Sequence, residues 1–234
     1  MYKRVLLKIS GEACSSKTAT FDSEFLNELA LELKKVINNG TQVAIVVGGG
    51  NIMRGKFASQ LGLSRMEADK MGMLATVINA LAIKSACQSN GLEAVVQSSI
   101  EMNRVCDIVD YQKAIDHLEK GHVVIYGGGT GNPYFSTDSA AALRACEISA
   151  QAILMAKNGV DGVYDSDPAI NPKAKKYDTI SIEEVLDKKL AVIDLSATIM
   201  CLENKMPMLI FGLNEENSIV NSVIGEFNGT RVTV

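Results

Sequence analysis

The chain has 234 residues, of which 47% are hydrophobic and 21% are charged, which is the composition of an ordinary globular protein. Its net charge of −4 is untypical of nucleic-acid-binding proteins, and no run of 18 apolar residues predicts a membrane span. The first apolar run, residues 5–7, is too short for a secretion signal. Five separated cysteines and two histidines form no metal-ligand spacing, which weighs against zinc sites and histidine triads. We therefore expect a cytoplasmic protein with reduced cysteines and without nucleic-acid or membrane partners.

The first predicted elements are a strand at residues 5–9, a helix at residues 22–38 and a second strand at residues 43–47. This βαβ order favours a parallel sheet flanked by helices. Lys8 interrupts the first apolar strand. It either faces solvent on an edge strand or points inward, where it needs an anion as partner.

A glycine turn, Gly-Gly-Gly-Asn at residues 48–51, follows the second strand. The spacing from Gly50 to Lys56 fits the start of a P-loop, but the next residue is Phe57, where a P-loop needs Ser or Thr for magnesium. We therefore reject a P-loop. The turn and the nearby Arg54 still form a phosphate-binding pattern, because a guanidinium matches phosphate oxygens in a bidentate way.

A long helix is predicted from Ser64 to about Gln88, because Ser64 and Glu67 have capping-box spacing. Its apolar face comprises Met66, Met71, Leu74, Val77, Ile78 and Leu81. Asp69 lies in the first turns of this helix, just past the glycine turn. It either complements the helix dipole or accepts hydrogen bonds from ligand hydroxyls.

A second glycine loop follows a strand predicted at residues 123–126, after another strand at 93–97 and a helix at 111–120. Gly127, Gly128, Gly129 and Gly131 come first, then hydroxyl residues, Asp138 and a helix-forming alanine run. A glycine loop before a helix start is typical of an anion site, because unpaired backbone N–H groups and the helix dipole favour negative charge. The alternative is a tight turn capped by Asp138 that needs no ligand. Both glycine loops are expected at the carboxyl edge of the sheet, where α/β proteins bind ligands.

The last third of the chain is predicted to hold strands at 152–156, 207–211 and 230–234 and helices at 181–187, 195–204 and 218–224. Residues 157–168 form a polar segment rich in glycine and aspartate. This segment either holds a base and a ribose through Asn158, Tyr164 and a carboxylate, or is a surface loop. Because no linker divides the chain, we predict one domain, 1–234, with lobes at about 1–150 and 151–234.

Five segments match one family in order and spacing: 2–13 (YKRVLLKISGEA), 46–55 (VVGGGNIMRG), 69–76 (DKMGMLAT), 129–138 (GTGNPYFSTD) and 155–164 (MAKNGVDGVY). On these segments the chain resembles the bacterial-type UMP kinases (uridylate kinases) of the amino-acid kinase superfamily. The resemblance implies an α/β fold, a three-layer αβα sandwich around a mainly parallel central sheet. It also implies transfer of the ATP γ-phosphoryl group to UMP, giving UDP and ADP, in pyrimidine nucleotide (CTP) biosynthesis.

The resemblance further implies roles for individual residues. The expected ATP-binding residues are Lys8, Ile9, Ser10, Gly11, Gly50, Arg54, Asn158, Tyr164 and Asp167. The expected UMP-binding residues are Gly49, Asp69, Thr130, Gly131, Asn132, Pro133, Tyr134, Phe135, Ser136 and Thr137. Lys8, Arg54 and Asp138 are the expected catalytic residues, and Asp138 would orient the lysine and the water shell of the metal.

The resemblance also implies the cofactor and the assembly. Mg2+ would arrive with ATP, without direct side-chain ligands. Residues 1–150 would be the UMP-binding lobe and 151–234 the ATP-binding lobe. The assembly would be a homohexamer, for which the apolar face of the long helix is a candidate interface. Relatives often have several glycines in a loop linked to activation by GTP, but residues 14–20 contain none, so GTP activation does not follow here.

The sequence leaves two other functions open. One is a kinase of the same superfamily that phosphorylates a carboxylate or carbamate, against which Asp69 and the Thr-Gly-Asn-Pro run weigh. The other is a nucleotide-binding sensor or storage protein without turnover. The joint presence of Lys8, Arg54 and Asp138 weighs against a sensor, because pure binding does not need Asp138.

Overall fold

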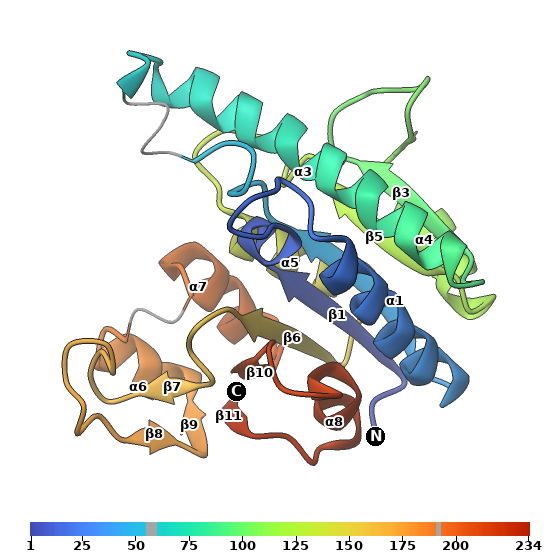
Figure 1. Ribbon diagram of the computed structural model, residues 1–234. Helices are drawn as coiled ribbons and strands as arrows, with labels where there is room; N and C mark the ends of the chain where they lie inside the picture. Colours follow the sequence, from blue (N-terminus) through green and yellow to red (C-terminus); the bar gives the residue numbers. More distant parts are fainter. Residues whose placement is uncertain (55–59, 191–192) are drawn as a thin grey trace.

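A computed structural model describes residues 1–54, 60–190 and 193–234, and within them a nine-stranded sheet lies between two layers of helices (Figure 1). In sheet order the strands are β4 (Asp107–Ile108), β3 (Ala94–Ser98), β5 (Val123–Gly127), β2 (Gln42–Val47), β1 (Arg4–Ile9), β6 (Ala152–Lys157), β10 (Met208–Gly212), β11 (Gly229–Thr233) and β9 (Thr179–Ser181). Neighbouring strands are parallel except for β10 and β11. The predicted α/β sandwich around a mainly parallel sheet is confirmed.

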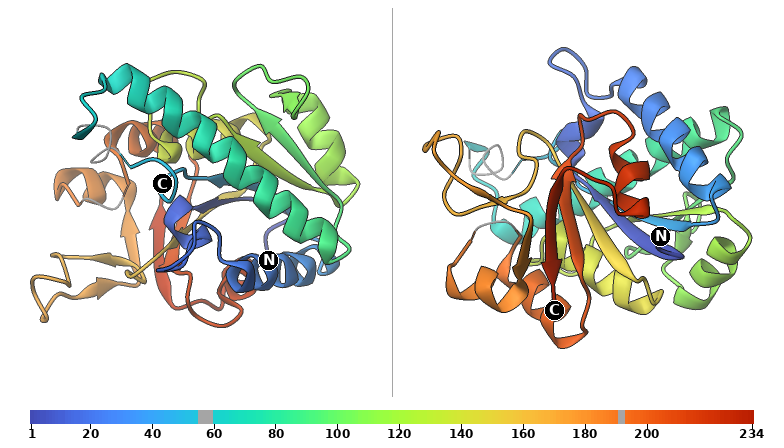
Figure 2. Two further views of the ribbon diagram at one scale, coloured as in Figure 1. Left: turned by 45° about the horizontal axis from the view of Figure 1, so that its top comes forward. Right: turned by 90° about the horizontal axis from the view of Figure 1, so that it is seen from below.

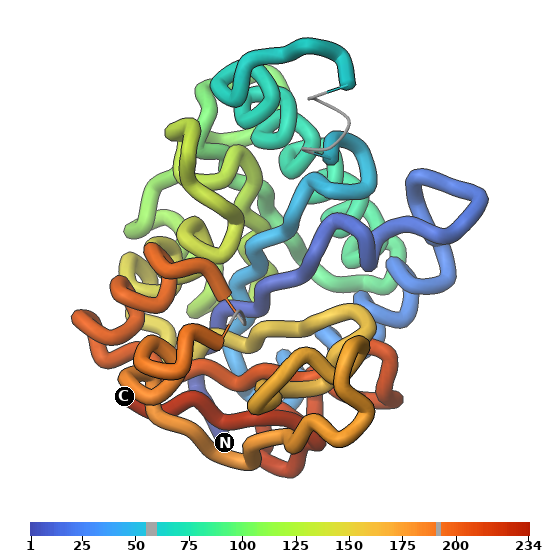
Figure 3. The backbone as a smooth tube through the Cα atoms, turned by 90° about the vertical axis from the view of Figure 1, so that its left-hand side faces the viewer, coloured from blue at the N-terminus to red at the C-terminus, as the bar shows by residue number. Residues whose placement is uncertain are grey.

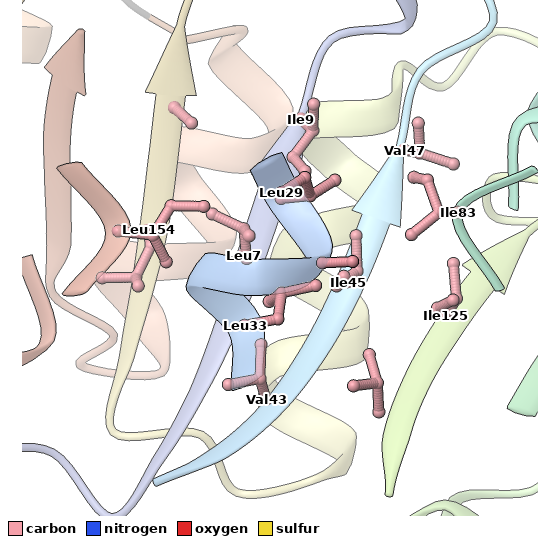
Figure 4. Packing of buried hydrophobic residues seen from close by; sticks show 14 of the residues in the cluster. Leu7, Ile9, Leu29, Leu33, Val43, Ile45, Val47, Ile83, Ile125 and Leu154 are labelled. Atoms are coloured by element: carbon pink, nitrogen blue, oxygen red, sulfur yellow. The ribbon is translucent and has the colours of Figure 1, made fainter. Parts of the chain in front are cut away.

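Each face of the sheet is covered by its own helices. One face carries α1 (Ser23–Asn38), α3 (Arg65–Ser89) and α8 (Ser218–Ile224), and the other carries α4 (Tyr111–Glu119), α5 (Thr137–Glu147), α6 (Ile182–Asp187) and α7 (Leu195–Glu203). Successive strand side chains point to opposite faces. Leu7 and Ile9 therefore pack with Leu29 and Leu33 of α1 (Figure 4), whereas Leu6 belongs to the core on the α5 side.

Local capping signals set the helix starts as the sequence predicts. The Asp22 side chain accepts hydrogen bonds from two backbone N–H groups at the start of α1, and Ser64 and Glu67 form the capping box of α3. The cap of α5 is Ser136, whose hydroxyl accepts from the backbone N–H groups of Asp138 and Ser139. The reading of Asp138 as the helix cap is therefore wrong, because Ser136 already supplies the capping oxygen.

The short elements escape sequence analysis. They are the 3-10 turn η1 (Gly11–Cys14), β4, β7 (Val163–Tyr164), β8 (Lys176–Tyr177) and β9. Strands of two or three residues carry too little alternation to be recognised. Strands β7 and β8 form a separate antiparallel hairpin that extends away from the main sheet (Figure 2). The rejected P-loop spacing, with Lys56 and Phe57, lies outside the described residues.

The topology brings four strand ends to one edge. Strand β1 pairs in parallel with β2 on one side and β6 on the other (Figure 3), and β5 pairs in parallel with β2. The carboxyl ends of all four strands, and the polar segments that follow them, therefore share an edge, which in open α/β sheets is where ligands bind. No helix in the described part of the chain is long and apolar enough to cross a membrane.

Candidate active site

The glycine turns after β1 and β2 meet at the centre of this edge. A Cβ atom at Gly11 would lie 2.6 Å from the backbone nitrogen of Gly50 and 2.7 Å from the carbonyl oxygen of Gly48. The N–H of Gly48 donates to the carbonyl of Ile9 across 2.8 Å. Only glycine permits this approach, so the two turns form one backbone surface suited to phosphate oxygens.

Lys8 points into the α5 side of the sheet, because it shares the strand face of Leu6. Its Nζ lies 2.7 Å from Oδ1 of Asp138, and the two side chains are only 11% and 14% exposed. The reading of Lys8 as a solvent-facing lysine is therefore wrong. A lysine buried in a central strand is costly unless it is paired, and Asp138 at the start of α5 supplies the pairing.

A second lysine, Lys157, ends β6 beside this pair, and sequence analysis missed it. Residues 153 and 155 of β6 pack on the α5 side, so strand alternation turns Lys157 to the same face as Lys8. Burial lowers the pKa of Lys157, the neighbouring Lys8 lowers it too, and the carboxylates of Asp138 and Asp194 oppose this shift. The available signal was a lysine at the end of an apolar strand, the same signal that identified Lys8.

Asp194, also missed, joins the starts of α5 and α7. Its carboxylate accepts hydrogen bonds from the hydroxyls of Ser136 and Ser139 and from the backbone N–H of Ala197. Burial raises the pKa of this carboxyl, but hydrogen bonds from these groups and from Ser196 outweigh burial and hold the pKa below its usual range. The residue therefore remains a carboxylate and fixes the start of α5, which carries Asp138.

Arg54 stands on the β2 side of the same edge. Its Nε donates to the carbonyl of Gly50 across 3.3 Å, and its Nη2 lies 3.1 Å from Oε1 of Glu12. The Arg54 side chain is 65% exposed, so its ion pair with Glu12 contributes little stability, and the guanidinium can exchange Glu12 for another anion. Ser10 directly follows β1, and its buried hydroxyl has no hydrogen-bond partner among the described residues. Both groups are suited to receive phosphate oxygens.

A cavity of about 200 Å³ opens between α3 and the glycine loop after β5. Its walls include the predicted residues Gly49, Gly50, Arg54, Asp69, Asn132, Phe135, Ser136 and Thr137, together with Thr76 and Gly129. Oδ2 of Asp69 accepts a hydrogen bond of 2.7 Å from the backbone N–H of Tyr134. The cavity therefore combines a carboxylate, hydroxyls and an arginine, groups that can bind the hydroxyls and the anionic end of a small polar ligand.

The remaining predicted loop residues lie beside this cavity rather than in its walls. The Thr130 hydroxyl bonds within the loop, to Asn132, and Gly131 packs against Ser99. Tyr134 adopts a left-handed backbone conformation, with φ of 72°, and its side chain is exposed. Pro133 lies between these residues. The structure thus gathers one part of residues 130–137 around the cavity and leaves the other part on its rim.

A larger cavity of about 560 Å³ lies beside Lys157. Its walls include Lys157, Tyr164, Asp167, Lys188 and Lys189. The predicted Asn158 is adjacent in sequence but is not in the wall, and its side chain accepts a hydrogen bond of 3.4 Å from Asn214. Ile9 belongs to the hydrophobic core, so only its backbone is available to a ligand.

The Tyr164 wall of this larger cavity is held by a carboxylate. The Tyr164 hydroxyl donates to Asp161 across 2.6 Å, and Nζ of Lys176 donates to the same carboxylate across 2.8 Å. Partial burial raises the pKa of Asp161, but the Lys176 and Tyr164 hydrogen bonds hold it below its usual range. The segment that sequence analysis left open between a loop and a ligand site therefore borders a cavity and is ordered by β7 and β8.

The family model described as the amino acid kinase family matches residues 3–212. The chain belongs to the amino acid kinase family. This match confirms the superfamily predicted from the five sequence segments.

Three solved structures of kinases resemble this amino acid kinase chain. The UMP kinase of Ureaplasma parvum is 39% identical, with 100% of each chain covered and a TM-score of 0.95. The UMP kinase of Bacillus anthracis is 38% identical, with 99% of this chain and 96% of the other covered and a TM-score of 0.96. The uridylate kinase of Archaeoglobus fulgidus is 31% identical, with 98% and 99% covered and a TM-score of 0.75.

Proposed function

We propose that this chain is a UMP kinase, which transfers the γ-phosphoryl group of ATP to UMP and gives UDP and ADP. The main support is the Lys8–Asp138 pair, because neighbours of Asp138 line both cavities. Thr137, the residue before Asp138, lines the smaller cavity, and Lys157, a close electrostatic neighbour of Asp138, lines the larger one. Full-length similarity to two UMP kinases supports the choice of acceptor.

The proposed mechanism is in-line transfer with positioning and charge neutralisation as its main devices. The acceptor phosphate oxygen is already an anion, so no strong general base is needed. Lys8, Lys157 and Arg54 neutralise the charge that spreads over the transferred group, and the two glycine turns supply backbone N–H donors. In this proposal Asp69 binds ribose hydroxyls of UMP once Tyr134 releases it, and Tyr164 and Asp167 border the base and ribose of ATP.

Magnesium is proposed to enter with ATP. Among the described residues, no group of three or more His, Cys, Asp or Glu side chains lies close enough together to bind a metal ion. The carboxylate of Asp138 fits an ion that is held mainly by phosphate oxygens and water, because carboxylate oxygens are hard donors that suit Mg2+. The ion pair with Lys8 fixes this carboxylate at the edge of the sheet. When bound, Mg2+ would supply charge stabilisation of the phosphates.

The acceptor test measures ADP release from Mg-ATP with UMP, CMP, AMP, acetylglutamate or carbamate. We expect turnover with UMP alone. Lys8→Ala should abolish it, whereas Lys113→Ala, the same substitution at an exposed position of α4, should not. Turnover with acetylglutamate or carbamate would indicate another kinase of the family, and no turnover with any acceptor would indicate a nucleotide sensor.

We also propose a homohexamer in the cytoplasm that supplies UDP for pyrimidine nucleotide (CTP) synthesis. Support for an oligomer comes from the apolar surface of α3, where four side chains are 42–47% exposed: Met66, Met71, Leu74 and Ile78. An apolar stripe of this kind is typical of a subunit interface. Sedimentation of the wild type should give a hexamer, and Leu74→Glu should give smaller species. A wild-type monomer would contradict the proposal.

A further inference from the structure

The buried guanidinium of Arg144 has no part in the proposed reaction, yet it connects to the wall of the smaller cavity. Its Nη2 donates to the hydroxyl of Ser99 across 3.2 Å, and that hydroxyl donates to the carbonyl of Gly129 across 2.7 Å. Gly129 lines the cavity. A continuous chain of two hydrogen bonds therefore runs from α5 to the loop that would enclose UMP.

The surroundings of Arg144 fix its direction. Its side chain is only 7% exposed, it forms an ion pair with Glu147, and its guanidinium lies 5.8 Å from the ring centre of Tyr126. Side chains of a helix lean toward its N-terminus, so a long side chain in the last turns of α5 reaches the carboxyl edge of the sheet. Arg144 and Asp138 thus belong to one helix but serve different parts of the site.

Ser99 holds the glycine loop at more than one point. Its N–H donates to the carbonyl of Gly127 across 3.1 Å. A Cβ atom at Gly128 would lie 2.9 Å from the nitrogen of Ser99, and a Cβ atom at Gly131 would lie 3.0 Å from its carbonyl oxygen. Both glycines have positive φ, so the loop can pack this closely only in its observed conformation.

A buried ion pair contributes little net stability compared with well-packed apolar side chains. What Arg144 offers beyond packing is a fixed, five-donor group that an apolar residue cannot replace. We infer that Arg144 is a positioning residue that acts through Ser99 to hold the glycine loop in the shape that binds the nucleoside monophosphate acceptor. The inference rests on the proposed function for the identity of that acceptor.

The kinetic test is a double-mutant cycle with Arg144→Met, Ser99→Ala and the double variant. Each single change should raise KM for UMP by about tenfold, the scale of losing one ordering hydrogen bond, with KM for ATP changed by less than about twofold. Because both residues belong to one chain of contacts, the double variant should be no worse than the worse single variant. Additive effects, a parallel rise in both KM values, or an unchanged KM for UMP in both single variants would overturn the inference.

The matched control is Arg4→Met. Arg4 is also a largely buried arginine, and it donates to the carbonyl of Ile148, the residue that ends α5, across 2.7 Å. A general loosening of α5 would therefore appear in this variant too. We expect Arg4→Met to lower Tm while leaving KM for UMP unchanged; a matching rise in KM would reduce Arg144 to a structural role.

Amide hydrogen exchange over residues 127–131 tests the inference without activity. Exchange should be faster in Arg144→Met and Ser99→Ala than in the wild type and Arg4→Met, and equal exchange in all four would overturn the inference. Ser99→Ala removes only one oxygen and serves alone if Arg144→Met does not fold. A wild type without UMP turnover would contradict the proposed function. In that case the comparison of hydrogen exchange would still decide whether Arg144 positions the glycine loop.

Discussion

Replacing Asp138 by asparagine separates charge from shape at the centre of the site. The carboxylate lies 2.7 Å from Nζ of Lys8, and both side chains are largely buried. Asparagine keeps the volume but leaves Lys8 without its counter-charge. Removing one partner of a buried ion pair costs about 3–5 kcal/mol, and the lower value suits this edge of the sheet. At about 2–4 °C per kcal/mol for a chain of this size, Tm should fall by about 6–12 °C.

The effect of Asp138→Asn on turnover should exceed its effect on binding. Asp138 is not in the wall of the smaller cavity, so KM for UMP should change by less than about threefold. Misplacing Lys8 should lower kcat by about 10²–10³, by analogy with the loss of one preorganised donor to a transition state. The measurement is steady-state ADP release below the lowered Tm, with Asp110→Asn, a change at the cap of α4, as control. Equal losses in kcat and in UMP affinity would refute the catalytic role of Asp138.

Three further changes test other parts of the edge. Gly11→Ala should abolish turnover and lower Tm, because the new Cβ would lie 2.6 Å from the Gly50 nitrogen, whereas Gly72→Ala in α3, with open space around its Cβ, should raise Tm in the same thermal scans. Lys157→Met should lower kcat strongly but Tm only slightly, because burial already disfavours the charged form of this lysine in the folded state. An unchanged kcat would show that Lys157 has no role in the mechanism. Asp194 has a depressed pKa in the folded state, so its stabilising effect is present above the ordinary value of 3.8 and is lost as pH falls through the folded pKa. The difference in urea midpoint between the wild type and Asp194→Asn should therefore shrink between pH 7 and pH 3; a constant difference would contradict this account.

Local signals were sufficient for the long elements of the fold. The apolar runs of β1 and β2, the caps Asp22 and Ser64 and the periodicity of α1 all lie within a few residues of the structure they specify. Strands β7 and β8 could not be predicted in this way, because two residues carry no period and pairing between distant segments decides their conformation.

Some residues of the candidate site could likewise be recognised from local sequence signals, and others could not. Glycines next to strand ends, a lysine within an apolar strand and the Thr-Gly-Asn-Pro run are visible in the sequence, and they correctly indicated the edge and the family. Lys157 and Asp194 were missed because their importance comes from neighbours more than fifty residues away, which include Lys8, Ser136 and Ser139.

The sequence by itself determined which strands, caps and glycine turns this protein has, because these depend on neighbours along the chain. Only the tertiary structure decided which charges meet. The parallel register of β1 and β6 turns Lys8 and Lys157 to one face, and the Ser136 cap leaves Asp138 free to pair with Lys8. It likewise decided that Arg144, an unremarked residue of a helix, reaches the glycine loop through Ser99. Such contacts depend on the packing of α5 against the sheet, which no local pattern encodes.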